Sequence, residues 1–404
     1  MPSTPCTRAD FLAWGAAAAV SAAALPAAAD DVEAPQRLDY ALVLSGGGAR
    51  GAYEAGLIDY LRLARGAADF SALAPYQIVC GTSIGALNGY FVATGQYSLL
   101  RELWYGIARQ DVVRLKRRYA KIANPDSGVG TRIAAGMRLI LSLTSHDTGV
   151  IDGEHLRAWM AHYIDPERPV VIPFVWPVTN LSTQSPEFFY LIDRRLSGTE
   201  RARAAQAIRT VVGPNAVLRE ATPELLIDAL RASAAIPVAF DPVSLPSARN
   251  PDLSDQYVDG GVTANTPVSV ARAAAHNVHI VMLDPPFERA EYANAFDIGY
   301  GVFGAMQRRI LEADLRAAYL ETFGKRAMET LPQQADAYAH AHGVDIASLR
   351  AFAARLFDSE IAVVRPEREL PVSVVGFDDA ANIFATFKLG FEAARAGFAP
   401  YVFS

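Results

Sequence analysis

The sequence predicts an α/β protein in which a mostly parallel sheet lies between helices. From Leu38 onward, short apolar runs alternate with longer stretches of helical spacing, which indicates βαβ units. Two glycine-containing turns each stand between a predicted strand and a predicted helix. The 404 residues are 51% hydrophobic and 20% charged, which is typical of a folded protein and argues against an extended disordered chain.

The predicted strands are short apolar runs bounded by turn residues. They are LDYALVLS from residue 38, YQIVCGTS from 76, VIPFVWPVTNLS from 171, EFFYLID from 187, QYVDGG from 256 and HIVMLDP from 279. Helices are predicted after the first two strands and near Gly153–Tyr163 and Pro223–Ser233, where apolar residues recur at helical spacing. The alternation of strands and helices indicates one α/β domain over residues 38–285.

Beyond Pro286 the composition changes to long helical stretches. Helices are predicted over Asp297–Thr330, Pro332–Leu356 and Ala380–Ala396, with one strand at IAVVRPE from residue 361. No Gly-, Ser- or Pro-rich linker precedes them. We therefore expect residues 286–404 to form a mainly helical carboxy-terminal elaboration packed on the same domain.

The amino end is typical of a secretory signal peptide. An alanine-rich apolar run extends over Phe11–Ala29, Arg8 precedes it, and an A-x-A cleavage pattern predicts cleavage near Asp30. The alternative is a membrane anchor, but this run is weakly hydrophobic and barely reaches the roughly 20 apolar residues of a membrane span. Ala9 stands where a twin-arginine signal has its second arginine, which favours the general secretory route. We expect residues 1–29 to be removed and the protein to be exported to the periplasm, the cell envelope or the medium.

Several classes of protein are disfavoured by composition. Cys6 and Cys80 cannot supply a disulfide framework, and the seven histidines show no zinc-site spacing, so no metal or other cofactor is expected. The formal net charge of −6 gives no overall attraction to nucleic acid. The basic run Arg109–Lys121 is better interpreted as a solvated surface, with docking to anionic lipid headgroups as the alternative.

The first candidate loop is Ser45–Gly51, set between a strand and a helix. Its consecutive glycines allow a sharp turn and expose N–H groups near a helix amino terminus, so the loop should hold a negative oxygen. Gly46, Gly48 and Gly51 also match the GxGxxG spacing of a dinucleotide site. Such a site requires an acidic residue at the end of the second strand, where none stands, since Asp69 precedes that strand.

The second strand ends in GxSxG, formed by Gly81, Ser83 and Gly85. In a strand-to-helix turn this pattern is a nucleophile elbow, in which the glycines avoid side-chain clashes and the serine hydroxyl is exposed. A glycine loop placed after the neighbouring strand would supply the donors that stabilise the oxyanion in acyl transfer. The two loops together are more specific than GxSxG alone.

A serine nucleophile requires a base. His276 and His279 follow in the order expected for a triad, but a structural role is the commoner explanation for histidines in such positions. Asp259, at the end of a short strand and followed by Gly260 and Gly261, is the stronger candidate. A partly buried carboxylate can take the serine proton directly, although Asp-Gly-Gly alone is also a common turn.

Four segments, in order, resemble the patatin-like phospholipase family: LSGGGARGAYEAGLIDYL, GTSIGALNGYFVA, DALRASAAIPVAFDPV and YVDGGVTANTPVSVARAA, within Leu38–Asp284. The resemblance implies a three-layer patatin-like fold and a Ser83/Asp259 dyad in place of a triad. It also implies an oxyanion hole at Gly46, Gly47 and Gly48, with Arg50 beside it as a positive or structural element. Asn265 and Pro267 match the loop after the aspartate, where an architectural role is expected. Ser233 matches the third segment but stands in no elbow, and we assign it no part in the mechanism.

The resemblance therefore implies a lipid acyl hydrolase acting on fatty acyl esters of phospholipids or lysophospholipids, and peripheral contact to a membrane is expected. Three alternatives remain. They are a carboxylesterase for soluble esters, a catalytically silent lipid-binding protein, and a dinucleotide-binding oxidoreductase.

Overall fold

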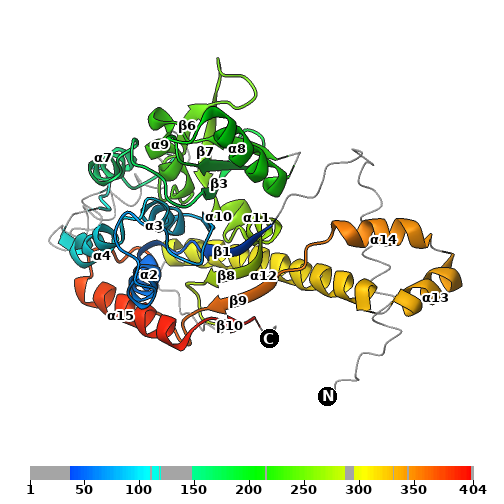
Figure 1. Ribbon diagram of the computed structural model, residues 1–404. Helices are drawn as coiled ribbons and strands as arrows, with labels where there is room; N and C mark the ends of the chain where they lie inside the picture. The colour runs from blue at the N-terminus through cyan, green and yellow to red at the C-terminus, as the bar shows by residue number, and fades with distance from the viewer. Residues whose placement is uncertain are drawn as a thin grey trace.

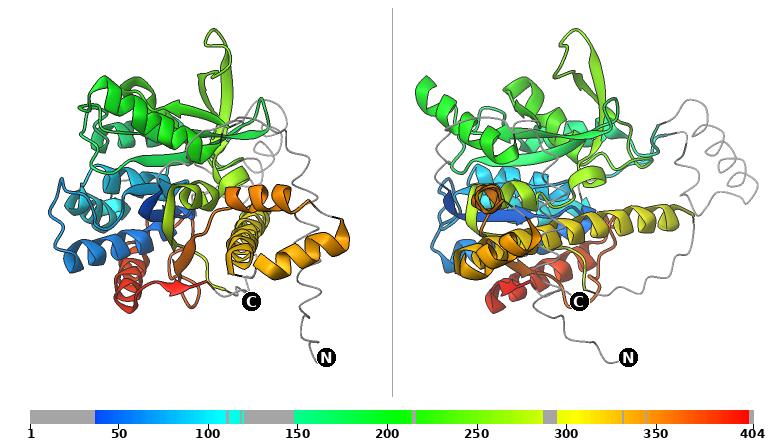
Figure 2. Two further views of the ribbon diagram at one scale, coloured as in Figure 1. Left: turned by 45° about the vertical axis from the view of Figure 1, so that its right-hand side comes forward. Right: turned by 90° about the vertical axis from the view of Figure 1, so that its right-hand side faces the viewer.

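The computed structural model describes residues 37–109, 112–117, 119, 148–213, 216–286, 295–330, 332–343 and 345–401. The predicted signal peptide and part of the basic run lie outside these ranges. The described ranges form a mixed sheet with helices on both of its faces (Figure 1 and Figure 2). No helix within them combines the length and the apolar character needed to cross a membrane.

Ten strands of the described ranges form one sheet, in which β9, β8, β1, β2 and β3 are parallel neighbours. Strand β10 pairs antiparallel with β9, β4 pairs antiparallel with β3, and β5 pairs parallel with β4. The hairpin of β6 and β7 joins the sheet through β7. The bounds are β1 Leu38–Leu44, β2 Ile78–Gly81, β3 Phe174–Asn180, β4 Ser185–Leu191, β5 Val217–Glu220, β6 Val243–Pro246, β7 Ser254–Asp259, β8 Ala275–Val281, β9 Glu360–Val364 and β10 Ala399–Pro400.

Strand β3 pairs with two different strands along one edge. Its first residues pair with the end of β2, where Cys80 lies opposite Val175. Three residues further along β3, Val178 lies opposite Asp259, the last residue of the antiparallel β7. Strands β2 and β7 therefore end facing each other, and Cys80 and Asp259 lie about 10 Å apart along β3 at a strand rise of roughly 3.3 Å per residue.

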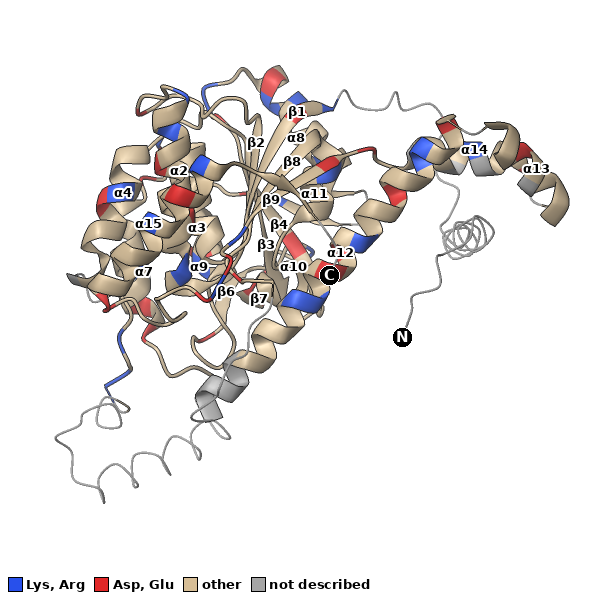
Figure 3. Ribbon diagram, turned by 90° about the horizontal axis from the view of Figure 1, so that it is seen from below, with Lys and Arg blue, Asp and Glu red and all other residues tan. Residues whose placement is uncertain are grey.

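Alternate residues of the central strands belong to different apolar clusters, as the period of two requires. In β1, Leu42 and Leu44 belong to one cluster and Ala41 and Val43 to the other. Figure 3 shows the sheet between the two groups of helices. The first group is α2 (Ala52–Ala64), α3 (Ile84–Ala93), α4 (Tyr97–Gly106), α7 (Gly153–Tyr163), α9 (Pro223–Ser233) and α15 (Ala380–Ala396), and the second is α8 (Gly198–Val212), α11 (Val268–Ala274) and α12 (Ala295–Thr330).

The residues beyond 286 are built into this fold. Strands β9 and β10 extend the sheet, and α15 packs on α2. One end of α12 contacts the short helix α10 (Gly261–Ala264), and its other end carries α13 (Pro332–His342) and α14 (Ile346–Arg355) away from the sheet (Figure 1). Two short 3-10 helices, η1 (Gly48–Gly51) and η2 (Ile107–Arg109), complete the described elements.

The α/β fold class with its parallel-rich sheet and helical carboxy-terminal elaboration is confirmed. The single helix predicted over Pro332–Leu356 is wrong. Gly343 adopts a φ of +64°, and Asp345 then caps a new helix by accepting hydrogen bonds from the N–H groups of Ala347 and Ser348. Strands β5 and β6 and helices α4 and α8 carry no prediction from the sequence.

Helices α2 and α15 cross at two glycines. A Cβ atom on Gly56 would lie 1.9 Å from the Phe387 carbonyl oxygen, and one on Gly390 would lie 1.8 Å from the Tyr53 carbonyl oxygen. The contact is backbone against backbone, so no side chain can move to relieve it. The crossing fastens the last helix to the helix that follows the glycine loop.

We expect Gly390→Ala to lower the free energy of unfolding by about 1–3 kcal/mol or more, because the added methyl group forces the helices apart. Chemical denaturation followed by circular dichroism measures this. Gly304→Ala in α12 is the matched control, since a Cβ there meets nothing within 4 Å and alanine is favoured in helices by about 1 kcal/mol. Equal stability of G390A and wild type would contradict the proposed close crossing.

Candidate active site

The glycine loop follows β1 directly. The N–H of Gly46 donates a hydrogen bond to the carbonyl oxygen of Asn265 at 3.4 Å, whereas those of Gly47 and Gly48 have no hydrogen-bond partner in the described ranges. Gly48 has a φ of +57°, and a Cβ there would lie 2.2 Å from the Val374 carbonyl oxygen. Two neighbouring backbone donors are therefore available in this loop.

Ser83 occupies a strained turn between β2 and α3. Its φ of 55° and ψ of −124° lie in a region that residues other than glycine rarely adopt. The turn is tight enough that a Cβ on Gly81 would lie 2.3 Å from the Gly85 carbonyl oxygen, and one on Gly85 would lie 2.4 Å from that of Leu44. This is the geometry of a nucleophile elbow.

Asp259 ends β7 and is fully buried, and it interacts with the Ser83 hydroxyl. Burial raises the pKa of Asp259 from 3.8 to about 7, while hydrogen bonding with Ser83 and with the N–H of Gly261 lowers it less. The Gly261 N–H donates to Oδ1 at 2.7 Å. No group of the described chain reaches Oδ2 with full hydrogen-bond geometry. This oxygen is thus free to accept a proton.

The loop after Asp259 is fixed against the sheet and the glycine loop. The Thr179 hydroxyl donates to the Asp259 carbonyl oxygen at 3.0 Å, and the Thr82 hydroxyl donates to that of Ala264, also at 3.0 Å. A Cβ on Gly260 would lie 2.3 Å from the Pro177 carbonyl oxygen. Asn265 is buried beside Gly46, and Pro267 precedes α11. The loop has little room to shift.

Arg50 lies in η1, just before α2, and is buried. Its guanidinium pairs with Asp284 at 2.7 Å and approaches Glu369 at 3.8 Å. A Cβ on the adjacent Gly51 would lie 2.4 Å from Ile84. Arg50 therefore links the glycine loop to the chain after β8 and to the carboxy-terminal region.

Neither candidate histidine contacts Ser83 in the described chain. His279 lies in β8, where its Nδ1 is 2.9 Å from the Tyr76 hydroxyl and its ring stacks on Phe398. Burial lowers the pKa of His279 to about 4. His276 lies nearer the amino end of β8 and interacts with Arg37. Both positions fit structural roles.

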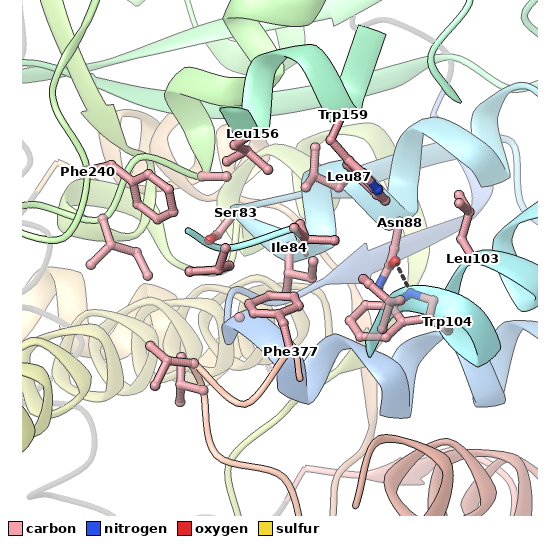
Figure 4. Close-up of a pocket in the computed structure, with 18 of the residues that line it drawn as sticks. Ser83, Ile84, Leu87, Asn88, Leu103, Trp104, Leu156, Trp159, Phe240 and Phe377 are labelled. Carbon is pink, nitrogen blue, oxygen red and sulfur yellow. Dashed lines mark hydrogen bonds between the residues drawn. The ribbon is translucent and has the colours of Figure 1, made fainter. Parts of the chain in front are cut away.

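A largely apolar pocket with a cavity volume of about 80 Å³ opens beside Ser83 (Figure 4). Asn88 lines it, but its amide already bonds to the Trp104 indole N–H and the Glu54 carboxyl group. The other lining side chains are apolar and come from distant segments: Ile84, Leu87, Phe91, Leu100, Leu103, Trp104, Ile107, Val112, Val113, Ile151, Leu156, Trp159, Ile164, Ala234, Ile236, Ala239, Phe240, Val374, Val375 and Phe377. Such a pocket suits a hydrocarbon chain.

A sequence model described as patatin-like phospholipase matches residues 42–272, which include the glycine loop, Ser83 and Asp259. This chain belongs to the patatin-like phospholipase family. A comparison with curated proteins gives no significant match.

Among solved structures, the chain is similar to a crystal structure of VipD from Legionella pneumophila, at 13% sequence identity and a TM-score of 0.35. The similarity covers 89% of this chain and 66% of that chain, just under two thirds. A similarity this distant carries no argument about the site.

Within the described ranges, no group of three or more His, Cys, Asp or Glu residues could hold a metal ion.

Three features of the site were missed by the sequence reasoning. The first feature is the support of Asp259, because the hydroxyl of Thr179 and the carbonyl of Ala235 both form hydrogen bonds with the backbone of Asp259. The second feature is a part of the pocket wall that comes from the carboxy-terminal region, where Val374, Val375 and Phe377 line the pocket. The third feature is Ser233, whose hydroxyl accepts a hydrogen bond from the Ser83 N–H. Its position was marked in the sequence, because Ser233 lies in one of the four segments that resemble the family.

We expect Asp259→Asn to stabilise the protein increasingly as the pH rises. Because the folded-state pKa of Asp259 is raised to about 7, the folded protein retains a proton that the unfolded chain releases above about pH 4. Wild-type stability therefore falls between pH 4 and 7, and the variant avoids this loss. Denaturation should show a gain of up to about 4 kcal/mol at pH 8 and little at pH 4.5.

Asp345→Asn is the control, because hydrogen bonds with Ser348 lower the pKa of Asp345 and no gain at high pH is expected. A stability difference between D259N and wild type that stays constant from pH 4.5 to 8 would contradict the buried, proton-retaining carboxyl group.

Proposed function

We propose that this protein is a lipid acyl hydrolase that cleaves fatty acyl ester bonds of phospholipids or lysophospholipids with a Ser83/Asp259 dyad. One observation carries the proposal. A strained, elbow-type serine contacts a buried carboxyl group, with a pKa of about 7, at an apolar pocket. A base with a pKa near neutral pH is well suited to remove a serine proton.

The reaction proceeds through a covalent intermediate. Asp259 accepts the hydroxyl proton of Ser83 as Oγ attacks the ester carbonyl carbon, and the N–H groups of Gly47 and Gly48 stabilise the oxyanion. Collapse of the tetrahedral intermediate breaks the ester bond, and the leaving alcohol takes the proton from Asp259. Water then attacks the acyl-serine, with Asp259 again accepting a proton, and the fatty acid is released.

The apolar lining of the pocket supports an acyl chain as the part of the substrate that is bound. Figure 4 shows Ser83 among apolar side chains, with Phe240 to its left and Leu87 and Leu103 to its right. Val375 lines the pocket and is 44% exposed, and Val238, between lining residues Ile236 and Ala239, is 57% exposed. These exposed valines support peripheral contact between the pocket entrance and a lipid surface.

The basic run Arg109–Lys121 gives weaker support for contact with a lipid surface than the exposed valines do. Within it, Lys116 forms an ion pair with Asp241 at 2.7 Å, so its charge is partly neutralised. Arg114 and Arg117 are exposed beside the pocket-lining Val113. Both the solvated-surface interpretation and the headgroup-docking alternative are compatible with these positions.

The proposal is tested by fatty acid release from phospholipid and lysophospholipid micelles by the mature protein. We expect Ser83→Ala to reduce hydrolysis to background and Asp259→Asn to reduce it by about 10²–10⁴-fold, with no effect of a chelator. A preference for micelles over soluble short-chain esters is expected from the apolar pocket and the exposed valines.

Thr94→Val, a buried substitution remote from Ser83, controls for general loss of folded enzyme. A folded wild type that binds lipid without releasing fatty acid would indicate a lipid-binding protein. Faster hydrolysis of soluble esters would indicate a carboxylesterase. Activity that survives Asp259→Asn but not Ser83→Ala would reopen the question of the base.

We also propose that the enzyme is exported after removal of residues 1–29. The apolar run and the A-x-A pattern support this location, where envelope lipids are accessible. Amino-terminal sequencing of the exported protein should begin near Asp30, and Ala29→Phe should leave the precursor uncleaved. Full-length protein confined to the cytoplasm would contradict the proposal.

A further inference from the structure

We propose that Ser233 is a positioning residue that holds the backbone of Ser83 in its reactive conformation. The inference rests on the proposed function, because it assigns a role toward the nucleophile of that reaction. Ser233 is the last residue of α9, 150 residues from Ser83 in the chain, and is 0% exposed.

The Ser233 hydroxyl is engaged on both sides. Its Oγ accepts a hydrogen bond from the Ser83 N–H at 3.1 Å and donates one to the Pro177 carbonyl oxygen at 2.7 Å. Pro177 lies in the middle of β3, within the sheet. The hydroxyl therefore connects the backbone of the strained serine to a rigid strand.

This connection meets a specific need of the elbow. With a φ of 55°, the Ser83 N–H cannot join a regular helix or strand ladder, and a buried N–H without a partner destabilises the conformation that buries it. A donor left in that state would favour rotation of the backbone toward an ordinary conformation. Such a rotation would move the Oγ of Ser83 relative to Asp259.

The same segment also holds the other half of the dyad. The Ala235 carbonyl oxygen accepts the N–H of Asp259 at 2.9 Å, and the Thr179 hydroxyl of β3 donates to the Asp259 carbonyl oxygen. The turn after α9 and strand β3 therefore fix the backbone of both Ser83 and Asp259. Their separation is set by one short stretch of chain, Ser233–Ala235.

Ser233 does not line the pocket, and its hydroxyl is already used as donor and acceptor. It therefore acts through Ser83 and does not touch the substrate. A residue of this kind should affect the rate of attack more than substrate binding, since an error of about 1 Å in position can cost roughly 100-fold in rate.

The test compares wild type, Ser233→Ala and Thr94→Val. Thr94 is the matched control, because its hydroxyl is equally buried, donates to the Tyr90 carbonyl oxygen at 2.8 Å and accepts from the Gln96 side chain at 2.9 Å. Each protein is assayed for kcat and KM on lysophospholipid and for its rate of labelling by a fluorophosphonate, which reports the nucleophilicity of Ser83. Circular dichroism gives the folded fraction.

We expect S233A to lose about 10–100-fold in kcat and in labelling rate per folded molecule, with KM within about twofold of wild type. T94V should lose stability without these losses. Ser233→Thr keeps the hydroxyl and should label within about threefold of wild type, even where its extra methyl group lowers stability.

S233A with wild-type kcat and labelling, or with losses no larger than those of T94V, would overturn the inference while leaving the proposed function intact. Labelling of S233T as slow as that of S233A would also overturn it, because the hydroxyl is restored. A wild type that neither hydrolyses lipid nor reacts with fluorophosphonate would instead overturn the proposed function, and this inference with it.

Discussion

The backbone turn at Ser83 is the constraint on which the rest of the site depends. A chain leaving β2 can enter α3 within two residues only if Ser83 adopts a positive φ and helix α3 approaches the end of β1 closely. Gly85 permits that approach, since a Cβ there would lie 2.4 Å from the Leu44 carbonyl oxygen. The turn therefore places the nucleophile beside the glycine loop, because both follow the carboxyl ends of adjacent parallel strands.

The position of the base follows from an interruption in the sheet. Strand β2 is four residues long, and beyond its end the same edge of β3 pairs with β7 running in the opposite direction. The last residue of β7 must then meet the residues that follow β2. Burial at this junction raises the pKa of Asp259, and the Ser83 hydroxyl lies beside the carboxyl group. One topological feature thus supplies both the proximity and the basicity that the proposed chemistry requires.

Local patterns in the sequence predict the parts of this arrangement that depend on neighbouring residues. The strand–turn–helix around Ser83 and the strand that ends at Asp259 can be recognised because glycines and apolar runs mark them. The break at Gly343 was missed, because a single glycine does not distinguish a helix end from a tolerated interior position. Strands β5 and β6 were missed too. Each is four residues long and is stabilised by pairing with distant strands more than by its own composition.

The role of Ser233 could not be derived from the sequence for the same reason. Its partners, Ser83 and Pro177, are 150 and 56 residues away, and only the folded sheet brings them within hydrogen-bond distance. The motif segment around Ser233 marks a position without indicating whether it reacts, binds or supports. The Ser233 hydroxyl already accepts one hydrogen bond and donates another, which indicates a supporting residue and not a reacting one.

The site also extends beyond residues 42–272, to which the family match is confined. The carbonyl oxygen of Val374 accepts the Ala49 N–H at 2.8 Å, next to the two free donors of the glycine loop, and Phe377 stacks on Trp104 in the pocket wall. The charges of Arg50 and Glu369 approach each other across the same boundary. The groups proposed to carry the chemistry thus lie within the matched region, while part of the pocket wall comes from the region after it. Substrate preference can therefore change through Val374 and Phe377 while the arrangement of Ser83 and Asp259 is retained.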